Sequence, residues 1–459
     1  MEITRTLAKS IIAVDYRTLS RKAIEATKRL VLDSLACAVG GSSMVEMKSL
    51  NDLVKEWDGK KESTVVAFGS RVPSPSAALV NGSMGRALDF DDCYDKAPIH
   101  SAVPVVSAGF AVAERRGAVS GKEFITAVTL GIDLSCRMSA ATPLEGLEGY
   151  GWTYSAIYGY FGAAATSAKI LGLSEKKLLN ALGIAYHQAS GTRSGNAQGC
   201  TTKAMGSGFA ARGGVVSALM AERGLTGSNE CMAGKWGIYN LFHRGECITE
   251  RLTDGLGKTF MGEDDSLKPY PCCRCIHPFI DAALTLVKEN NIRPEDVERV
   301  TAYAGEKTYI GECEPLELKQ NPPNSVAAQF SIPWVLAIAI TYRKVEIKDF
   351  TEQALRNKDI HRLARKVITR KDPELNQPAI EPAVVEINMK DGRVYRERVS
   401  HARGSPENPL TTKDVAEKFR NCASYAARPI PKKKLGQTVQ MVEGLDDVTD
   451  VGQIIRLLG

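Results

Sequence analysis

The chain has 459 residues, of which 44% are hydrophobic and 24% are charged, and its net charge is +6. This composition is typical of a globular protein, and the length favours two hydrophobic cores over one. The basic residues are scattered, without the clustered, aromatic-interleaved face of a nucleic-acid-binding protein. No apolar run reaches the roughly 18–20 residues of a membrane span, and the start of the chain lacks the apolar core of a signal peptide. We therefore expect a cytoplasmic protein that binds neither nucleic acid nor membrane.

Eleven cysteines, an odd number, occur without a signal peptide, so we expect reduced thiols and not a disulfide framework. Cys272, Cys273 and Cys275 lie close together, with His277 nearby. A structural zinc site usually combines a CxxC pair with a second, distant pair of ligands. We therefore expect no metal here and interpret the cluster as a packed or substrate-lining loop.

The first half of the chain is predicted to be almost entirely helical. Two capping-box patterns, Ser43-x-x-Glu46 and Ser120-x-x-Glu123, predict helix starts. A β-rich stretch at 64–68 predicts a short strand. Periodicity and capping predict helices at about 21–40, 44–57, 75–88, 121–138, 155–171, 175–190, 203–223 and 276–290.

Several of these predicted helices are rich in small residues. The segments 162–165 (GAAA) and 206–208 (GSG) lie inside periodic stretches. Glycine in a helix interior costs about 1 kcal/mol relative to alanine, so it needs a reason. Close packing of helices is the first interpretation, and room for a ligand between helices is the alternative.

The pattern changes after about residue 265. Strands are predicted at 299–303, 383–389 and 394–399, and Asp391-Gly392 between the last two predicts a hairpin. Helices are expected near 325–341 and 350–370, and the tail from Thr411 is helical again. We therefore predict a mainly α protein, with a large all-helical domain at 1–267 and 406–459 and a smaller α+β domain at 268–405.

Six histidines occur, and His100 follows the acidic segment 89–95 (DFDDCYD). Three interpretations stay open for this cluster: solvated charges after a helix, a metal site, or an acid/base pair. A carboxylate near an imidazole can select its tautomer and raise its pKa, which suits general acid/base catalysis.

Lys203 lies where a loop is predicted to enter a glycine-rich helix. A lysine at a helix start is unfavourable for the helix dipole, but together with the exposed N–H groups it could bind an anion. A solvated surface lysine is the alternative.

His277 follows a proline-containing segment and precedes Pro278, so it is predicted near a helix N-terminus at the domain junction. Junctions favour small-ligand clefts. The alternative is a histidine that faces solvent in the first turn of the helix.

These segments together resemble the MmgE/PrpD family, which includes 2-methylcitrate dehydratase, cis-aconitate decarboxylase and iminodisuccinate epimerase. P-loop, GxSxG and HExxH patterns do not occur. The resemblance rests on 86–92 (RALDFDD), 100–104 (HSAVP), 159–165 (GYFGAAA), Thr202-Lys203, 268–273 (KPYPCC), 277–278 (HP) and 328–333 (AQFSIP).

The resemblance implies a homodimer in which an all-helical domain and an α+β lid domain enclose an active site that needs no cofactor or metal. It implies polar catalytic residues at Asp89, His100, Lys203 and His277. Substrate-binding positions are expected at Cys93, Thr153, Cys272, Cys273, Arg274 and Trp334.

Three of these positions depart from the family pattern. Cys93 stands where threonine is usual, Thr153 where histidine is frequent, and Trp334 where tyrosine is common. A missing histidine and a missing phenol change the set of groups that can transfer protons. The substrate or the reaction is therefore open within the family.

The implied chemistry removes a proton next to a carboxylate of a small polycarboxylate. As a hypothesis, His277 or His100 is the base and acid, Asp89 orients His100, and Lys203 holds the substrate carboxylate. A hydro-lyase of the 2-methylcitrate dehydratase kind is our first expectation. An epimerase or a decarboxylase would use the same groups, and a non-catalytic carboxylate-binding homologue is the alternative from another class.

Overall fold

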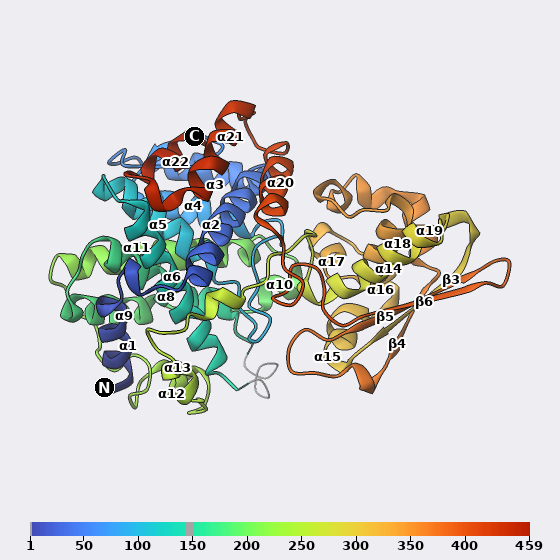
Figure 1. Cartoon of the computed structure of the whole chain (residues 1–459), viewed down its shortest axis with the longest axis horizontal. Coiled ribbons are helices and arrows are strands. Elements are labelled where there is room, and N and C mark those ends of the chain that lie inside the picture. Colours follow the sequence, from blue (N-terminus) through green and yellow to red (C-terminus); the bar gives the residue numbers. More distant parts are fainter. Residues whose placement is uncertain (1, 144–150) are drawn as a thin grey trace. The chain divides into compact units, whose positions relative to one another are not determined.

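The computed structural model describes residues 2–143 and 151–459, which form two compact units (Figure 1). The helical unit consists of Met1–Leu267 and Thr411–Gly459, and the α+β unit of Lys268–Leu410. The mainly α fold class predicted from the sequence is therefore confirmed.

The second boundary lies after Leu410 and not after the predicted residue 405. Hydrogen bonds keep the intervening segment in the α+β unit: the Arg403 N–H donates to Asp281 at 2.6 Å, and Ser405 pairs with Asn408. Thr411 then caps the next helix, so the helical unit resumes there.

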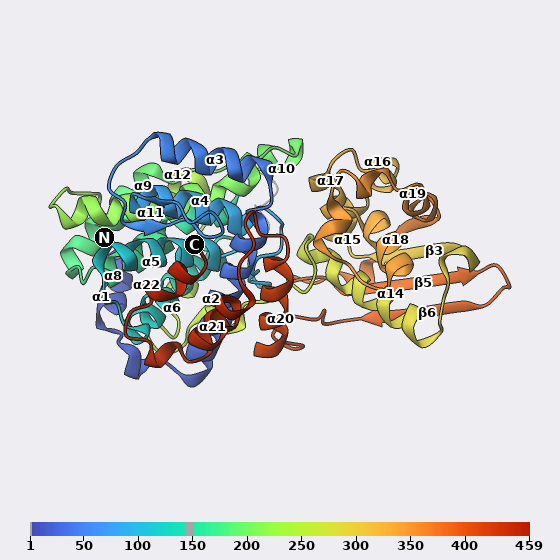
Figure 2. The ribbon, with the colours of Figure 1, turned by 90° about the horizontal axis from the view of Figure 1, so that it is seen from above.

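The centre of the helical unit is a bundle of buried helices that lie side by side in two views (Figures 1 and 2). Helix α11 packs against α4 and α8, and α5 packs against α4 and α8. Nearly every residue of α8 is buried, as expected for a helix that is apolar on all sides. The bundle comprises α2 (Arg21–Gly41), α4 (Ser74–Arg86), α5 (Ala102–Arg116), α6 (Gly121–Ala140), α8 (Tyr154–Ile170) and α11 (Thr202–Glu222).

The remaining helices surround this bundle, and α20 from the tail packs against α2. The tail therefore completes the helical unit, as the sequence predicts. These helices are α1 (Glu2–Ala13), α3 (Val45–Glu56), α9 (Glu175–Gln188), α10 (Ser194–Gln198), α12 (Ile238–Phe242), α13 (Glu250–Thr253), α20 (Thr412–Ala423), α21 (Lys432–Glu443) and α22 (Gly452–Leu457).

Two local predictions in the first part of the chain need correction. The capping box of Ser120 with Glu123 is confirmed, but the one at Ser43 is wrong, because the Ser43 hydroxyl donates to the Gly40 carbonyl and α3 begins at Val45. The predicted strand at 64–68 is only β1 (Ser63–Thr64), paired with β2 (Arg71–Val72). The chain turns at Ala67, whose φ is +60°, before it returns as β2.

Close packing explains the glycines of the central helices. A Cβ on Gly208 of α11 would lie 2.3 Å from the Leu79 carbonyl oxygen of α4, and one on Gly82 would lie 2.9 Å from the Gly208 Cα. A Cβ on Gly162 would lie 2.1 Å from the Ser135 hydroxyl. The close-packing interpretation is therefore confirmed, and the end of α4 is held against the start of α11.

The α+β unit contains a four-stranded sheet in the order β4-β3-β5-β6. The strands β3 and β4 are parallel, and the other neighbours are antiparallel. Helix α14 packs on β5 and β6, and α18 packs on α14 and β4 (Figure 2). The elements are β3 (Val297–Ala304), β4 (Val367–Lys371), β5 (Ala383–Met389), β6 (Val394–Val399), α14 (His277–Glu289), α15 (Glu306–Thr308), α16 (Leu316–Gln320), α17 (Ser325–Gln329), α18 (Ile332–Tyr342) and α19 (Lys358–Ala364).

The predicted hairpin of β5 and β6 is confirmed, with Gly392 at φ +89° in its turn. The helix predicted at 350–370 is wrong in its second half, where β4 pairs with β3. The β-branched run Val367-Ile368-Thr369 suits a strand, so tertiary pairing prevails over the helical period. The helix predicted at 325–341 is broken between α17 and α18, because Ser331 caps α18.

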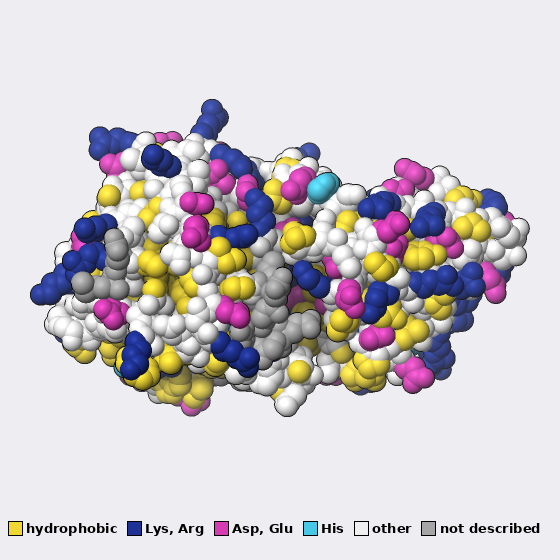
Figure 3. All heavy atoms as spheres, turned by 90° about the horizontal axis from the view of Figure 1, so that it is seen from below, with side chains coloured by type: hydrophobic (Ala, Val, Ile, Leu, Met, Phe, Trp, Pro, Cys, Tyr) yellow, Lys and Arg dark blue, Asp and Glu magenta, His cyan; other side chains and the backbone are white. Residues whose placement is uncertain are grey.

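The visible face in Figure 3 carries Lys and Arg side chains interspersed with Asp and Glu. Among the described helices, no single one is long and apolar enough to cross a membrane, and α2 with α3 meets that test only as a pair bent by 94°.

We expect Gly208→Ala to weaken the contact between α4 and α11. The added methyl would overlap the Leu79 carbonyl, and overpacking of this kind costs about 1–3 kcal/mol. Thermal unfolding followed by circular dichroism should show a lower midpoint. The control is Gly436→Ala in α21, where the new Cβ meets open space and helix propensity favours alanine. Equal midpoints for Gly208→Ala and the wild type would contradict the role given to this contact.

Candidate active site

The acidic segment after α4 is buried and not solvated. Asp89, Asp91 and Asp92 are each at most 1% exposed. Asp89 has a φ of +52°, a strained conformation that aspartate tolerates better than most residues. The interpretation of solvated charges after a helix is therefore wrong.

Arg86, at the end of α4, neutralises two of these carboxylates. One guanidinium nitrogen lies 2.5 Å from Asp89 and 2.8 Å from Asp91, and the side chain is almost fully buried. Burial alone would lower the pKa of Arg86, but the charges of Asp91 and Asp89 outweigh it and raise that pKa. Arg86 therefore stays positively charged.

Lys203 is the second cation of the group. Its ammonium lies 3.2 Å from Asp89, and its side chain is only 7% exposed, so the surface-lysine interpretation is wrong. The chain reverses at Gly199, whose φ is +66°, and enters α11 at Thr202. A lysine in the first turn opposes the helix dipole, and the Asp89 carboxylate offsets that cost.

The contacts of His100 select one tautomer. Its Nδ1 lies 2.5 Å from the Asp92 carbonyl oxygen, which can only accept, so Nδ1 carries the proton. Its Nε2 lies 3.1 Å from the Arg86 guanidinium, which can only donate, so Nε2 is an acceptor. The ring is therefore neutral, with its lone pair at Nε2 directed towards Arg86.

The hypothesis that Asp89 orients His100 stays a prediction. The Asp92 carbonyl and Arg86 contact the ring, and the Asp91 carboxylate lies 3.7 Å from Nδ1. Asp89 joins Arg86 to Lys203. Asp91 is the carboxylate placed to stabilise the imidazolium form.

A second layer of buried acids supports this loop. The Asp92 carboxylate accepts the N–H groups of Ser101 and Ala102 at 2.8 and 3.1 Å, and the Ser101 hydroxyl donates to Asp265 at 2.8 Å. Burial, with the neighbouring charge of Asp91, raises the pKa of Asp92 to about 7. Burial and Asp92 likewise raise the pKa of Asp265. This pair therefore keeps a proton well above the usual range of a carboxylic acid.

Lys418 ties the acidic loop to the tail of the chain. Its ammonium lies 2.6 Å from Asp33 of α2 and donates to the Phe90 carbonyl at 2.6 Å. The tail helix α20 thus fixes the backbone between Asp89 and Asp91.

Cys93 and Thr153 belong to the same unit as the Asp89 group. Cys93 is buried, and its backbone pairs with Ser266. Thr153 stands at the start of α8, with its hydroxyl oxygen buried. The first turn of α8 is bonded to the site, because the His100 N–H donates to the Ser155 hydroxyl at 2.9 Å.

His277 lies in the α+β unit, at the first residue of α14, and is fully buried, so the solvent-facing interpretation is wrong. Its Nε2 lies 3.3 Å from the Cys272 carbonyl, and its Nδ1 lies 3.3 Å from the Arg274 guanidinium. By the same reasoning as for His100, Nε2 carries the proton and Nδ1 is the acceptor. Tyr270 packs edge-on against the ring, with centroids 5.3 Å apart.

Cys272 is fully buried, and the Cys273 thiol lies 3.3 Å from Glu312. Among residues 2–143 and 151–459, no three or more His, Cys, Asp or Glu side chains are grouped to hold a metal ion.

The substrate-binding role expected for Trp334 stays a prediction. Its side chain is 0% exposed and belongs to the hydrophobic core of the α+β unit. It packs edge-on against His361, with ring centroids 4.9 Å apart. The apolar helix α18 is buried from its first residues onward, and the indole Nε1 of Trp334 is buried without a hydrogen-bond partner among the described residues.

The structure thus brings together Asp89, His100 and Lys203 in one unit, and His277, Arg274 and Cys272 in the other. Sequence reasoning missed Arg86, which contacts both Asp89 and His100. Arg86 is the last residue of α4 and Asp89 lies beyond the helix at a φ of +52°, so their contact depends on a loop conformation that no local pattern predicts. A buried ion pair beside a neutral imidazole is suited to proton transfer on an anionic substrate.

Comparison with known proteins defines the protein family to which the chain belongs. The MmgE/PrpD N-terminal domain matches residues 5–250 and the MmgE/PrpD C-terminal domain matches residues 270–443. The chain therefore belongs to the MmgE/PrpD family, as its resemblance indicates.

Among curated relatives, cis-aconitate decarboxylase of Aspergillus terreus is 27% identical over 95% of this chain and 91% of its own length. Human cis-aconitate decarboxylase is 25% identical over 99% of this chain and 94% of its own length. The 2-methylcitrate dehydratase of Salmonella typhimurium is 24% identical over 85% and 84%. Decarboxylases and dehydratases are lyases, which supports an enzymatic role for this family member.

We expect nitrogen NMR of the His100 ring to show a protonated Nδ1 and an acceptor Nε2 at neutral pH. In Arg86→Lys the ammonium cannot serve both carboxylates and the ring in the same fork geometry, so the Nε2 signal should shift. The exposed His401 provides the internal control, because its signals should stay unchanged. A protonated Nε2 in the wild type would refute the assignment.

Asp92 predicts a pH-dependent stability. Its pKa of about 7 in the folded chain exceeds the ordinary 3.8, so the folded state binds the proton more tightly between these values. The proton on Asp92 therefore contributes to the free energy of unfolding fully below about pH 4. This stabilisation falls by about 1.4 kcal/mol per pH unit as the pH rises from there, and it is lost once the pH has passed 7. Asp92→Asn keeps an oxygen for the N–H groups of Ser101 and Ala102 but cannot ionise.

Urea denaturation at several pH values tests this expectation. Between about pH 5 and pH 7.5 the free energy of unfolding of Asp92→Asn should increase relative to that of the wild type. A difference that stays constant with pH would contradict it.

Proposed function

We propose that this chain is a cofactor-free lyase that acts on a small di- or tricarboxylate by proton transfer next to a carboxylate. The observation that carries the proposal is the buried Lys203, paired with Asp89 at 3.2 Å, in a group that also contains the neutral His100. The names of the full-length relatives support the same class of substrate.

Substrate binding would rearrange the cations of this group. A substrate carboxylate offers Lys203 and Arg86 a new anionic partner, and the first N–H groups of α11 favour the same charge. Arg86 donates to Nε2 of His100, so a shift of its guanidinium towards the substrate would free the lone pair of that nitrogen. His100 could then accept a proton at Nε2.

The charges around His100 suit this step. A proton at Nε2 makes an imidazolium, which Asp91 would stabilise from 3.7 Å. The electron pair left on the substrate spreads onto its carboxylate, where Lys203 and Arg86 would hold the negative charge. His277, whose Nδ1 accepts from Arg274, is the second proposed proton-transfer group.

Two reactions fit the relatives. In decarboxylation the bond between carbon and a carboxylate breaks and CO2 leaves. The electron pair left on carbon takes a proton from an imidazolium, which the histidine forms by first taking a proton from solvent at its accepting nitrogen. In dehydration a proton is removed and a β-hydroxyl leaves as water. The decarboxylases align with 95–99% of this chain and the dehydratase with 85%, so decarboxylation of a cis-aconitate-like substrate is our first candidate.

Dehydration of 2-methylcitrate is the second candidate, and epimerisation would use the same groups. The non-catalytic alternative rests on the departures at Cys93, Thr153 and Trp334. By the same resemblance we propose a cytoplasmic homodimer.

The test is a substrate panel in D2O followed by proton NMR, with cis-aconitate and 2-methylcitrate among the substrates. We expect turnover or proton exchange with one of them. Lys203→Met should lower the rate by about 10²–10³-fold, because a cation that stabilises developing charge is lost. The exposed Lys176→Met, in the same unit, removes the same charge and should keep wild-type activity.

Wild-type turnover by Lys203→Met would refute the assigned role of the lysine. Ligand-dependent stabilisation without exchange or turnover across the panel would instead support the non-catalytic carboxylate-binding homologue.

A further inference from the structure

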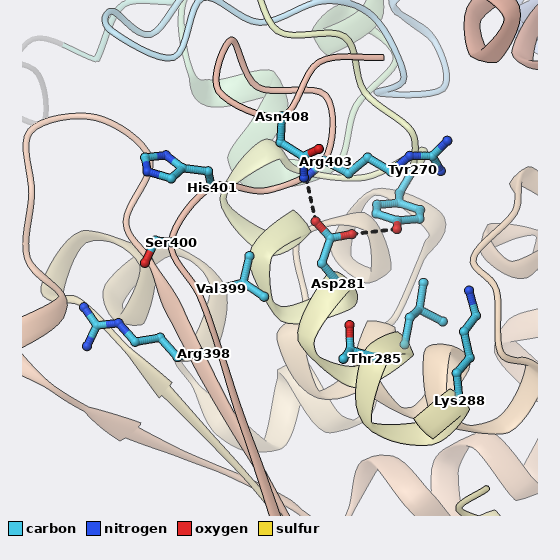
Figure 4. A pocket seen from close by; sticks show the side chains of 11 residues that line it. Tyr270, Asp281, Thr285, Lys288, Arg398, Val399, Ser400, His401, Arg403 and Asn408 are labelled. Carbon is cyan, nitrogen blue, oxygen red and sulfur yellow. Dashed lines mark hydrogen bonds between the residues drawn. The ribbon is translucent and has the colours of Figure 1, made fainter. Parts of the chain in front are cut away.

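A separate pocket lies within the α+β unit, between α14 and the segment that follows β6 (Figure 4). Its volume is about 810 Å³. The pocket is lined by three basic residues, Lys288, Arg398 and Arg403, together with His401. Hydroxyl and amide groups of Thr285, Ser400 and Asn408 add hydrogen-bonding capacity.

The single lining carboxylate is already engaged. Asp281 accepts from the Tyr270 hydroxyl at 2.7 Å and from the Arg403 N–H at 2.6 Å, as the dashed lines in Figure 4 show. Asp281 therefore fixes the wall of the pocket, and both of its oxygens already accept a hydrogen bond.

Two of the basic side chains have no carboxylate partner. Within the described part of the chain, neither Lys288 nor Arg398 has an acidic group within ion-pair distance, whereas His401 lies 3.7 Å from Glu407. Figure 4 shows Lys288 on α14 and Arg398 at the end of β6 on opposite sides of Thr285. Unpaired cations on two sides of a pocket attract an anion with more than one charged group.

We infer that this pocket binds a small anion that carries at least two carboxylate or phosphate groups. Lys288 and Arg398 bind its charged ends, and Ser400, His401, Arg403 and Asn408 line the pocket beside them. This site is distinct from the Asp89–Lys203 group, which belongs to the other unit. The inference does not depend on the proposed reaction.

Two chains of contacts connect residues that line the pocket with His277. Tyr270 donates to Asp281 and packs its ring against His277. The carbonyl of Arg403 accepts from Arg274 at 3.1 Å, and the same guanidinium nitrogen donates to His277. An anion that moves the Arg403 backbone or Tyr270 therefore changes the surroundings of the His277 ring.

The test uses isothermal titration calorimetry of the full chain in the Lys203→Met background, which weakens binding at the proposed active site. Citrate and pyrophosphate are the probes, so that the carboxylate and phosphate sources are compared. Lys288→Met with Arg398→Met should weaken the remaining binding at least about tenfold. The control pair is Lys390→Met with Arg370→Met, two exposed residues of the same unit outside the pocket lining.

Binding of either probe that survives Lys203→Met and is lost in the pocket pair, but not in the control pair, supports the inference. The tighter probe then identifies the class of anion. In addition, the His277 ring signals should shift with that probe and stay fixed in the pocket pair. No binding in the Lys203→Met background, or equal losses in both pairs, would overturn the inference. Circular dichroism melting of each variant checks that the exposed substitutions leave the fold intact.

Discussion

The close approach of α4 and α11 is the constraint on which the Asp89–Lys203 group depends. Gly82 and Gly208 leave room for backbone against backbone, so the C-terminal end of α4 lies beside the N-terminal end of α11. Arg86 is the last residue of one helix and Lys203 is in the first turn of the other. The strained Asp89 follows directly and joins the two cations. A larger side chain at either glycine would push the two helices apart. The charged groups would then be separated, although none of them had been substituted.

The charges of this group are stable only in combination. A buried carboxylate is costly unless it is paired, and removal of one partner leaves the other uncompensated. Arg86 and Lys203 offset Asp89 and Asp91, while Lys418 offsets Asp33 and holds the Phe90 carbonyl. Asp92 and Asp265 reach the same end by a raised pKa, because burial and the charge of a neighbouring carboxylate favour the protonated form of each. The tail helix α20 is therefore part of the support of the site, although it is remote in sequence.

Those elements that are encoded by local sequence patterns could be predicted from the sequence. The glycine-rich helices and the hairpin around Gly392 followed from spacing, whereas only the family resemblance pointed to Asp89, His100 and Lys203 as site residues. The surroundings of Trp334 could not be predicted, because alignment with a family position does not reveal that a side chain packs in a hydrophobic cluster. β4 was missed because its partner β3 lies far away in the sequence, and no local period encodes that pairing. Arg86 was overlooked because its role arises from contacts with His100 across a loop.

The two histidines are held by the same pair of contacts in opposite orientations. Each ring donates to a backbone carbonyl and accepts from an arginine, but through opposite nitrogens: His100 accepts at Nε2 and His277 at Nδ1. A backbone carbonyl cannot change its protonation, so it fixes the tautomer, whereas an arginine can be drawn away by an anion. Under the proposed function, a substrate carboxylate would draw away the arginine of a ring and release the basic nitrogen of that ring. The names of the relatives include decarboxylases and dehydratases, so the substrate, and not the histidines, would then decide which bond breaks.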